Sequence, residues 1–479
     1  MEESLAQTRN QIQDLLVRSA GEVSKSGASH LLSWSIPWEA DALVPFLYRA
    51  RGAPRIYWAS LQDEVNFVGY GVAAQLTASG PRRFKKIQSL STRLFSNIAL
   101  IGNSRPAGIL PRLFGGFSFN PDPDPLSLWA GFSAACFILP RYLISRYRGQ
   151  IWLTVNHQLR EGDDLDEILW LFTDQVEELK AELRQEGPGD PDLQTRAEQI
   201  QVEEVGSRSD WEAGISIAIR SIERGELRKL VIARSILVNS TQSIDPARAL
   251  MQLGKDYQDC YRFLFEPVPG KAFFGATPEL LIGVGETSAA TVALAGSARR
   301  GKSAREDREI AESLLEDPKE REEHGLVVET IRESLVPFVR SVEIPESPRV
   351  RKLSNIQHLE TQIRMNLKKS GSIISLVEAL HPTAAVGGVP REDALRLISE
   401  VERTTRGWYA SPVGWIDHRG NGLFTVAIRS AISSGNQAML YAGAGIVRES
   451  DPEAEWEETS LKFKPILAAL GAPADTNGF

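Results

Sequence analysis

The sequence has 479 residues, of which 42% are hydrophobic and 24% are charged, and its formal net charge is -8 at pH 7. This composition is ordinary for a soluble globular protein, and the length suggests two or three domains or one large α/β unit. Acidic and basic residues are mixed without a basic stripe, which argues against nucleic-acid binding. No apolar run is long enough for a membrane span, so we expect a cytoplasmic protein that does not bind a membrane.

Cysteine and histidine residues form no zinc-binding pattern. The two cysteines, Cys136 and Cys260, are far apart in apolar surroundings and are expected to be buried thiols. The six histidines form no H-x-x-x-H pattern, and the cysteines form no C-x-x-C pattern. A zinc site is therefore not expected.

The amino-terminal part of the chain is predicted to consist of strands separated by short helices. Residues 1–16 predict an amphipathic polar helix that lacks the features of a signal peptide. β-Branched, aromatic or alternating residues predict strands in HLLSWSIP, RIYWAS, FVGYGVAAQL, RLFGGFSFN, LWAGFSAACFILP and QIWLTVNH. A helix is expected at residues 82–96. Because few helical crossovers separate the strands, we expect an antiparallel sheet.

A Gly- and Pro-rich break divides the chain after a predicted helix at residues 163–185. The break is EGPGDPD, residues 186–192. We interpret it as a loop between two halves of one fold: a scaffold half at residues 1–206 and a second half at residues 207–470, with a tail at residues 471–479. An independent amino-terminal domain is the alternative.

Two ionisable residues interrupt apolar strands in the second half. Lys229 lies within LRKLVIARSILV, and Glu279 follows the Thr-Pro break in AFFGATPELLIG. A lysine in such a strand is usually an edge residue whose amine reaches solvent, and the alternative is a desolvated general base. Glu279 is either an exposed strand start or a buried carboxylic acid with a raised pKa that can donate a proton.

Two predicted helix starts carry glutamates three residues apart. The pairs are Glu320 and Glu323 in PKEREEH, and Glu455 and Glu458 in SDPEAEWEETSLK. Acidic helix starts are common because they complement the helix dipole. The alternative is that both starts together hold Mg²⁺, which normally takes one or two protein carboxylates and completes its shell with water or substrate oxygens.

The surroundings of the second glutamate pair favour the ligand-binding alternative. A strand ending at Gly443 and Gly445 precedes the helix, and these glycines let the backbone approach a ligand closely. Ser450 and Glu453 fit a capping box before the helix. Lys462 follows Glu458 by four residues, so the two side chains can share one helix face.

Three further residues lie in or beside predicted strands, and one of them, Arg429, is a candidate for binding an anion. The segment RKLSNIQHLETQIRMNL predicts a hairpin or bent strand centred on His358. Tyr409 lies at a predicted strand start, and Arg429 ends a strand that is expected to be buried. A buried arginine needs a partner, which a carboxylate can supply through two hydrogen bonds.

Together, the motifs between Trp211 and Leu467 resemble those of the chorismate-utilising enzymes, a group that includes isochorismate, salicylate, anthranilate and aminodeoxychorismate synthases. The resemblance implies the α+β fold of anthranilate synthase component I, which is a large, mostly antiparallel two-layer β-sandwich with helices on the outside. It also implies an active site between the two halves of the chain.

The resemblance implies a role for each candidate residue. Lys229 falls on the family's K-x-V/I-x-A/S-R strand, whose lysine activates water, and Glu279 falls on the G-A-S/T-P-E-x-L motif, whose glutamate is the general acid. By the same resemblance, Glu323 and Glu458 hold Mg²⁺, and Glu320 and Glu455 orient its waters. The implied substrate-binding residues are His358, Tyr409, Arg429, Gly443, Gly445 and Lys462.

The implied activity is Mg²⁺-dependent conversion of chorismate to isochorismate, for menaquinone or siderophore biosynthesis, without an obligatory protein partner. Ala295, in VALAGSARRG, stands where aminodeoxychorismate synthases have a nucleophilic lysine, so water is expected as the nucleophile. The loop HPTAAVGGVPR, residues 381–391, is similar to that of isochorismate synthases.

Three alternatives are open. A salicylate synthase would make the same intermediate and then eliminate pyruvate. Anthranilate synthase component I would normally need a glutamine amidotransferase partner, and no such domain is fused here. A non-catalytic binding protein would keep the carboxylates for structure, and the presence of Lys229 and Glu279 argues against it.

Overall fold

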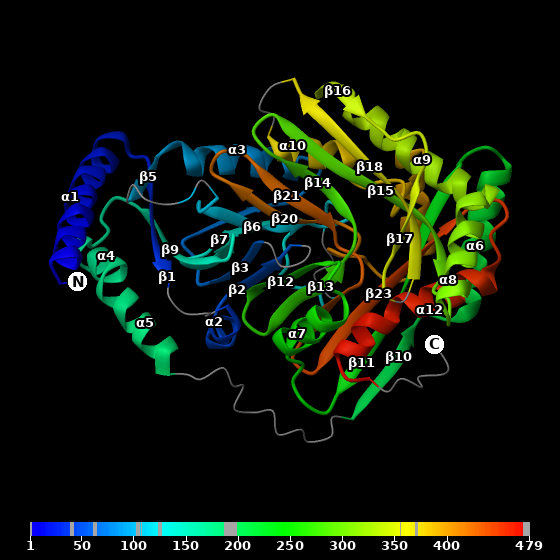
Figure 1. The fold of residues 1–479 in the computed structure, drawn as a ribbon, viewed down its shortest axis with the longest axis horizontal. Helices are drawn as coiled ribbons and strands as arrows, with labels where there is room; N and C mark the ends of the chain where they lie inside the picture. The colour runs from blue at the N-terminus through cyan, green and yellow to red at the C-terminus, as the bar shows by residue number, and fades with distance from the viewer. Residues whose placement is uncertain are drawn as a thin grey trace.

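The computed structural model shows two large β-sheets packed face to face, with helices on the outside (Figure 1). The described residues are 2–38, 43–60, 65–101, 106, 108–122, 127–185, 199–354, 356–368 and 372–472. The predicted break at residues 186–192 and most of the predicted tail lie outside them. Among the described residues, the α+β prediction of a mostly antiparallel two-layer sandwich is confirmed.

The larger sheet has 13 strands within the described ranges. Its order is β10 (Ile200–Val205), β11 (Lys229–Ser240), β23 (Gln437–Ile446), β22 (Ser430–Ser434), β13 (Lys271–Thr277), β12 (Tyr261–Val268), β2 (Arg55–Ala59), β3 (Val65–Tyr70), β8 (Tyr142–Tyr147), β9 (Gln150–Leu159), β1 (His30–Trp38) and β5 (Ile98–Ile101). Outside this order, the short strand β19 (Gly388–Val389) pairs with β11. Pairing is antiparallel, as between β11 and β23, whereas β1 pairs with β5 in parallel.

The smaller sheet has 10 strands in the same part of the chain. Its order is β16 (Val339–Glu343), β18 (Ile356–Leu367), β15 (Ser288–Arg299), β14 (Leu280–Val284), β21 (Gly422–Val426), β20 (Pro412–Asp417), β6 (Arg112–Phe117), β7 (Ala135–Leu139) and β4 (Ala74–Ala78). Outside this order, β17 (Arg349–Lys352) pairs with β18. Both sheets combine strands from residues 1–206 with strands from residues 207–470, so the two halves share one sandwich.

Helices cover the outside of the sandwich (Figure 1). They are α1 (Glu2–Ser26), α2 (Leu43–Arg49), α3 (Arg83–Ser96), α4 (Leu165–Phe172), α5 (Asp174–Gln185), α6 (Arg208–Glu223), α7 (Pro246–Asp256), α8 (Ala304–Glu316), α9 (Pro318–Leu335), α10 (Ile373–Leu380), α11 (Arg391–Val401) and α12 (Pro452–Ala469). None of the helices in the described segments is long and apolar enough to cross a membrane.

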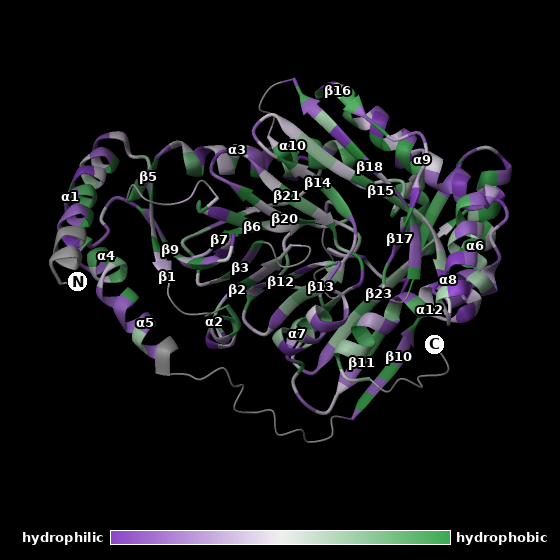
Figure 2. Cartoon of the chain, in the orientation of Figure 1, coloured by the Kyte–Doolittle hydropathy of each residue, from purple (hydrophilic) through white to green (hydrophobic). Residues whose placement is uncertain are grey.

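Two apolar cores hold these layers together. One contains side chains from both sheets, such as Trp58 and Phe114, and the other contains residues of α1, α7 and α12, such as Ile12, Leu250 and Phe463. Figure 2 shows hydrophobic residues on the strands and mixed hydrophobic and hydrophilic faces on the outer helices. Burying each such large apolar side chain contributes about 1.5–3 kcal/mol, so the sandwich rigidly supports whatever lies between its layers.

Three local predictions differ from the structure. The helix predicted at residues 163–185 is broken at Thr173, whose hydroxyl donates to Leu169 O at 2.7 Å and closes α4. The strand predicted in FVGYGVAAQL is two strands, β3 and β4, because Gly71 turns between them with φ of +67°. The N-cap of α12 is Asp451, which accepts from the amide of Ala454 at 3.0 Å, so the predicted Ser450 capping box is wrong.

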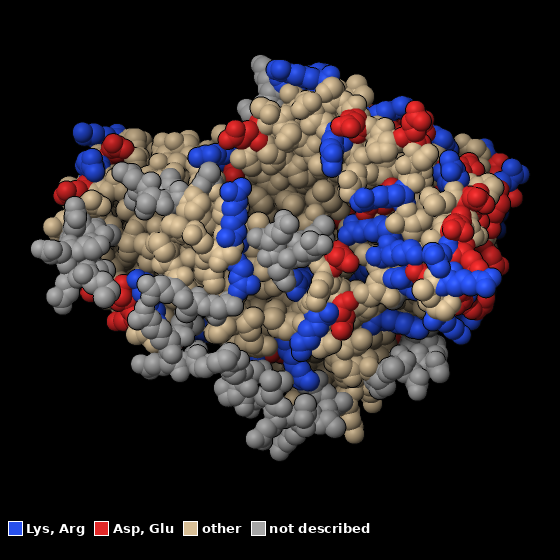
Figure 3. All heavy atoms as spheres, in the orientation of Figure 1, with Lys and Arg blue, Asp and Glu red and all other residues tan. Residues whose placement is uncertain are grey.

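Basic side chains gather over β17 and α8 on the face drawn in Figure 3. Acidic side chains compensate part of this charge. Arg300 and Lys352 both pair with Asp307, at 2.7 and 2.8 Å. The two signs of charge therefore lie next to one another over α8.

Candidate active site

A cavity lies between the two sheets where β11, β23, β15 and β18 meet the starts of α9 and α12. Its empty space, including the part open to solvent, is about 950 Å³. All its lining residues fall between Val231 and Lys462. The expectation of a site between the halves of the chain is therefore wrong: the second half alone lines the cavity, between the two sheets.

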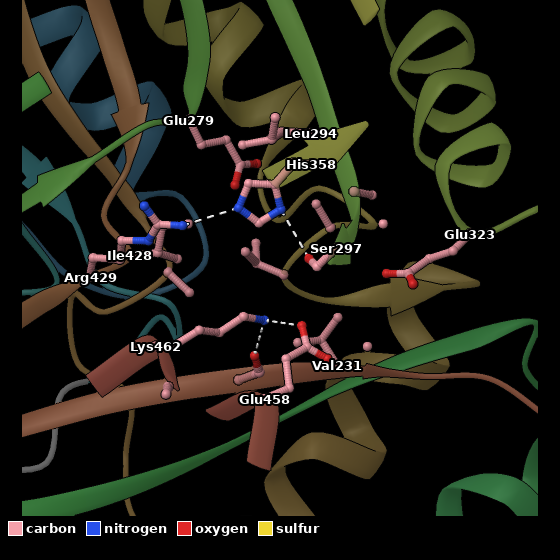
Figure 4. Close-up of a pocket in the computed structure, with 18 of the residues that line it drawn as sticks. Val231, Glu279, Leu294, Ser297, Glu323, His358, Ile428, Arg429, Glu458 and Lys462 are labelled. Atoms are coloured by element: carbon pink, nitrogen blue, oxygen red, sulfur yellow. Dashed lines mark hydrogen bonds and ion pairs between the residues drawn. The ribbon is translucent and has the colours of Figure 1, made fainter. Parts of the chain in front are cut away.

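The cavity brings together almost every residue that the sequence predicted. Figure 4 shows several of these side chains pointing toward one space from different elements. The predicted residues that line it are Glu279, Ala295, Glu320, Glu323, His358, Tyr409, Arg429, Gly443, Gly445, Glu455, Glu458 and Lys462. Lys229 is the predicted residue that does not line it directly.

Lys229 lies directly behind the cavity wall. It is the first residue of β11 and is completely buried, which excludes the interpretation as a solvent-exposed edge residue. Its Nζ donates to Oε1 of Glu323, which does line the cavity, at 2.7 Å. A movement of the Glu323 carboxylate would therefore connect the amine with the cavity.

Glu279 is a buried acid between β13 and β14. Its amide donates to Thr277 Oγ1 at 3.2 Å, and its carbonyl accepts from the amide of Val426 at 3.1 Å, so its backbone is tied to both neighbouring segments. Burial raises the pKa of its carboxyl to about 8, against the opposing charge of Lys229 and two other cations. The carboxyl is therefore mainly protonated at neutral pH and can donate a proton.

His358 is held in one tautomer by two neighbours (Figure 4). Nη2 of Arg429 lies 3.1 Å from Nε2 of His358, and because arginine only donates, Nε2 must accept. Nδ1 therefore carries the proton and donates to Ser297 Oγ at 2.9 Å. Burial, and then the charge of Arg429, hold the pKa of His358 well below its ordinary value, so the ring is neutral.

Arg429 has unused hydrogen-bonding capacity inside the protein. It is 6% exposed and lies between β21 and β22 with φ of +50°, an uncommon conformation for a non-glycine residue. Its Nη1 is buried and has no hydrogen-bond partner. A carboxylate in the cavity would satisfy this group, which fits an anion-binding role.

Tyr409 forms part of an aromatic wall. Its ring stacks on Tyr441 with centroids 5.1 Å apart, and the Tyr441 hydroxyl accepts from Trp129 Nε1 at 2.9 Å. Burial raises the pKa of Tyr409, so its hydroxyl stays neutral. This wall gives an unsaturated ring an apolar surface to contact.

Gly443 and Gly445 line the cavity from β23. The carbonyl of Gly443 accepts from Nζ of Lys462 at 2.8 Å. A Cβ on Gly445 would lie 2.7 Å from Oε1 of Glu323 and 3.0 Å from Cε of Lys229. Gly445 therefore leaves the space in which Lys229 and Glu323 meet.

We refer to Glu320, Glu323, Glu455 and Glu458 as the acidic cluster. Burial, and then the charge of Glu323, raise the pKa of Glu320 to about 7. Burial, and then the charge of Glu458, raise the pKa of Glu455. Burial opposes the charged form of Glu458 as well, but the charge and hydrogen bond of Lys462, at 2.7 Å, outweigh it and lower the pKa of Glu458. The carboxylates thus repel one another within one cavity.

This donor set fits Mg²⁺, which prefers carboxylate oxygens. In the described part of the chain, no group of three or more His, Cys, Asp and Glu side chains is arranged as a metal site. Mg²⁺ needs only one or two protein carboxylates, so two ligands from the acidic cluster would suffice. A divalent cation would also relieve the repulsion that raises the pKa values of Glu320 and Glu455.

The structure adds cavity residues to which sequence reasoning assigned no role. Ser297 orients His358, and its amide donates to Glu320 Oε2 at 2.8 Å. Arg406 donates to Val386 O and Val231 O at 2.6 and 2.8 Å, joining the loop 381–391 to β11. Lys319 also lines the cavity. Ser297 could have been found from its place two residues after Ala295, whereas no local pattern singles out Arg406.

His324 supports the cavity from behind. Its two ring nitrogens lie 3.2 Å from the carbonyl of Ala295 and 2.8 Å from Oγ1 of Thr361. Because a carbonyl only accepts, Nδ1 carries the proton and Nε2 accepts from the threonine hydroxyl. The start of α9 is thereby tied to β15 and β18.

Comparison with known proteins is consistent with this site. The family model described as "Chorismate binding enzyme" matches residues 16–471. Isochorismate synthase MenF of Bacillus subtilis (strain 168) is 36% identical over 449 residues, covering 92% of this chain and 93% of that protein. The salicylate biosynthesis isochorismate synthase of Pseudomonas aeruginosa is 34% identical over 473 residues, covering 98% of this chain and 96% of that protein.

Solved structures show the same fold. The menaquinone-specific isochorismate synthase MenF from Escherichia coli matches with a TM-score of 0.75 and 27% identity, over 95% of this chain and 99% of that chain. Anthranilate synthase component I from Streptococcus pneumoniae matches with a TM-score of 0.68 and 21% identity, over 84% of this chain and 92% of that chain, which supports the fold alone. With a family model that spans residues 16–471 and a cavity that gathers the family's motifs, this chain belongs to the chorismate-binding enzyme family.

Proposed function

We propose that this protein is an isochorismate synthase, which adds water to the chorismate ring beside the carbon that bears the carboxylate and releases the ring hydroxyl. The observation that carries the proposal is the pairing of a buried amine, Lys229, with a mainly protonated acid, Glu279, beside a cavity lined by Arg429, whose Nη1 has no hydrogen-bond partner. The relatives named isochorismate synthase, which align with most of the chain, support it.

Chorismate has two carboxylates, and the cavity offers separate positive groups for them. Arg429 has a free Nη1 for one carboxylate, and the Tyr409 hydroxyl is the second donor of this proposed pair. Lys462 lies on the wall formed by α12 and β23, near the acidic cluster. His358 accepts from Arg429 and so orients the guanidinium toward the substrate.

In the proposed reaction, Lys229 is the general base and Glu279 the general acid. Lys229 takes a proton from the attacking water once Glu323 no longer accepts its hydrogen bond. Glu279 gives its proton to the departing hydroxyl across the ring. Proton transfers by positioned side chains typically accelerate a reaction by about 10²–10⁴-fold each.

Mg²⁺ is part of the proposal, with Glu323 and Glu458 as its ligands and Glu320 and Glu455 as partners of its waters. When bound, it supplies Lewis-acid stabilisation of the ring carboxylate. The fit of the acidic cluster to a hard divalent cation supports this assignment.

The side chain at residue 295 supports water as the nucleophile. Ala295 lines the cavity and is 7% exposed, so this position offers no amine to the substrate.

We further propose that the enzyme is cytoplasmic and serves menaquinone or siderophore biosynthesis without an obligatory partner. The names of two relatives, one menaquinone-specific and one for salicylate biosynthesis, support the proposed pathways. Both cysteines of this chain are buried and form no disulfide, as in a reducing compartment, which supports the proposed localisation.

The test is product analysis of the purified protein with chorismate, with MgCl₂ or with EDTA, by chromatography. We expect isochorismate only with Mg²⁺, and its loss in Lys229→Ala and Glu279→Gln. Salicylate with pyruvate would identify a salicylate synthase, and anthranilate formed with ammonia would identify an anthranilate synthase. Absence of turnover under all these conditions would refute the enzymatic proposal in favour of a binding protein.

A further inference from the structure

Lys319 occupies an unfavourable position at the start of α9. The helix begins at Pro318 with Asp317 as its N-cap, so Lys319 lies in the first turn. The first amides of a helix carry the positive end of its dipole, where acidic side chains are preferred over basic ones. The side chain nevertheless lines the cavity and is 36% exposed.

The ammonium group of Lys319 reaches across to the other helix start. Its Nζ lies 3.6 Å from Oε1 of Glu455 on α12, which is longer than a hydrogen bond. Lys229 and Lys462, by contrast, each contact a carboxylate of the acidic cluster at 2.7 Å. Lys319 therefore has the loosest of these three lysine contacts and the most exposed side chain.

The positive charges that already lie beside the acidic cluster, including Lys319, oppose the binding of a further cation. Lys229, Lys319 and Lys462 bring three positive charges to the four carboxylates of the acidic cluster. A divalent cation that binds the cluster must therefore share its carboxylates with an ammonium group. Cations a few ångströms apart repel strongly when they are partly removed from water.

We propose that Lys319 is a tethered cation that bridges the starts of α9 and α12 and competes with Mg²⁺ for the acidic cluster. This inference rests on the proposed function, because Mg²⁺ is part of that proposal. The long contact and partial exposure let the ammonium group swing toward solvent without breaking a hydrogen bond. Lys319 thereby sets the Mg²⁺ concentration at which the site fills.

The first experiment measures binding of MgCl₂ alone by titration calorimetry at pH 8, without chorismate. Lys319→Met removes the competing charge, so the Kd for Mg²⁺ should fall on the order of tenfold. Lys319→Arg keeps the charge and should bind Mg²⁺ within about twofold of the wild type. Arg321→Gln is the matched control: it removes one positive charge from the same helix, where Arg321 donates to Leu315 O instead of lining the cavity.

A second readout uses thermal unfolding of the same variants. In EDTA, Lys319→Met should unfold at a lower temperature than the wild type, because four carboxylates then face only two lysines. Saturating MgCl₂ should raise the Tm of this variant more than that of the wild type, since tighter binding to the folded state stabilises it further. Arg321→Gln should show the wild-type shift.

Two outcomes would overturn the inference in different ways. If the wild type binds Mg²⁺ but Lys319→Met binds it equally or more weakly, Lys319 supports the site instead of competing, and the proposed function is unaffected. If the wild type shows no saturable Mg²⁺ binding in calorimetry or in the thermal shift, the Mg²⁺ part of the proposed function fails together with the inference.

Discussion

Replacement of Gly445 by alanine tests whether the contact between Lys229 and Glu323 matters for turnover. The new Cβ would lie 2.7 Å from Oε1 of Glu323, where ordinary contacts begin at 3.4 Å, so the carboxylate must move by 0.7 Å. It would also lie 3.0 Å from Cε of Lys229, which requires a shift of 0.4 Å. Both atoms belong to the ends of flexible side chains, so the backbone need not move.

The expected result is a loss of activity with little loss of stability. A misplacement of catalytic groups near 1 Å can cost about 10²-fold, so we expect kcat/KM to fall by roughly 30- to 100-fold. The free energy of unfolding should change by less than about 1 kcal/mol, because alanine restricts the unfolded chain and no backbone strain is introduced.

The assay is isochorismate formation at saturating Mg²⁺, with urea unfolding of the same preparations. Gly283→Ala is the matched control, because Gly283 also lies in a strand and a Cβ there would meet only Ala290 O, at 4.0 Å. The control should keep wild-type kinetics. Wild-type kcat/KM in Gly445→Ala would refute the argument that turnover depends on the space that this glycine leaves for Lys229 and Glu323.

Four further predictions concern the acid, the base and the anion-binding group. Because the pKa of Glu279 is raised from 4.5 to about 8, kcat/KM should fall as pH rises through about 8. In pH–rate profiles, the Glu279→Gln variant should lack this fall and should lose about 10²–10⁴-fold of activity. The folded state holds this proton more tightly than the unfolded chain, so the contribution of Glu279 to stability should be lost between about pH 4.5 and pH 8, and urea unfolding of Glu279→Gln should lack that decline. Lys229→Ala should abolish turnover while chorismate and Mg²⁺ still bind in calorimetry, and near-normal activity would exclude Lys229 as the base. Arg429→Gln should raise KM by roughly 10- to 100-fold, as expected from about 1.5–3 kcal/mol for a hydrogen bond to a charged group, and an unchanged KM would place the substrate carboxylate elsewhere.

The local pattern of the chain predicted several elements of the scaffold and of the site. Alternating and apolar runs located the scaffold strands β1, β2, β6 and β9 and the site strands β11 and β18, and the glutamate pairs at helix starts located α9 and α12. Predictions failed where a single residue changed the chain direction. Thr173 divides a helix through a hydroxyl contact with Leu169, and Gly71 sends one apolar run into two different sheets.

The residues suited to catalysis or ligand binding could be named from the sequence because their types and spacing are local properties. The burial and hydrogen bonds of these residues could not be predicted, because they depend on partners that are distant in the chain. Lys229 meets Glu323 across 94 positions, and Ser297 meets His358 across 61. Burial, which is produced only when the two sheets pack, excluded the solvent-exposed alternatives for Lys229 and Glu279.

The sequence by itself therefore determined the family, the strand-rich architecture and the identity of the candidate acid, base and carboxylate ligands. Only the tertiary structure decided that Glu279 is mainly protonated at neutral pH, that Arg429 keeps an unpaired donor, and that Lys319 faces the acidic cluster. The physical reason is that desolvation and charge–charge interaction act through space, whereas spacing and periodicity report only on neighbours along the chain.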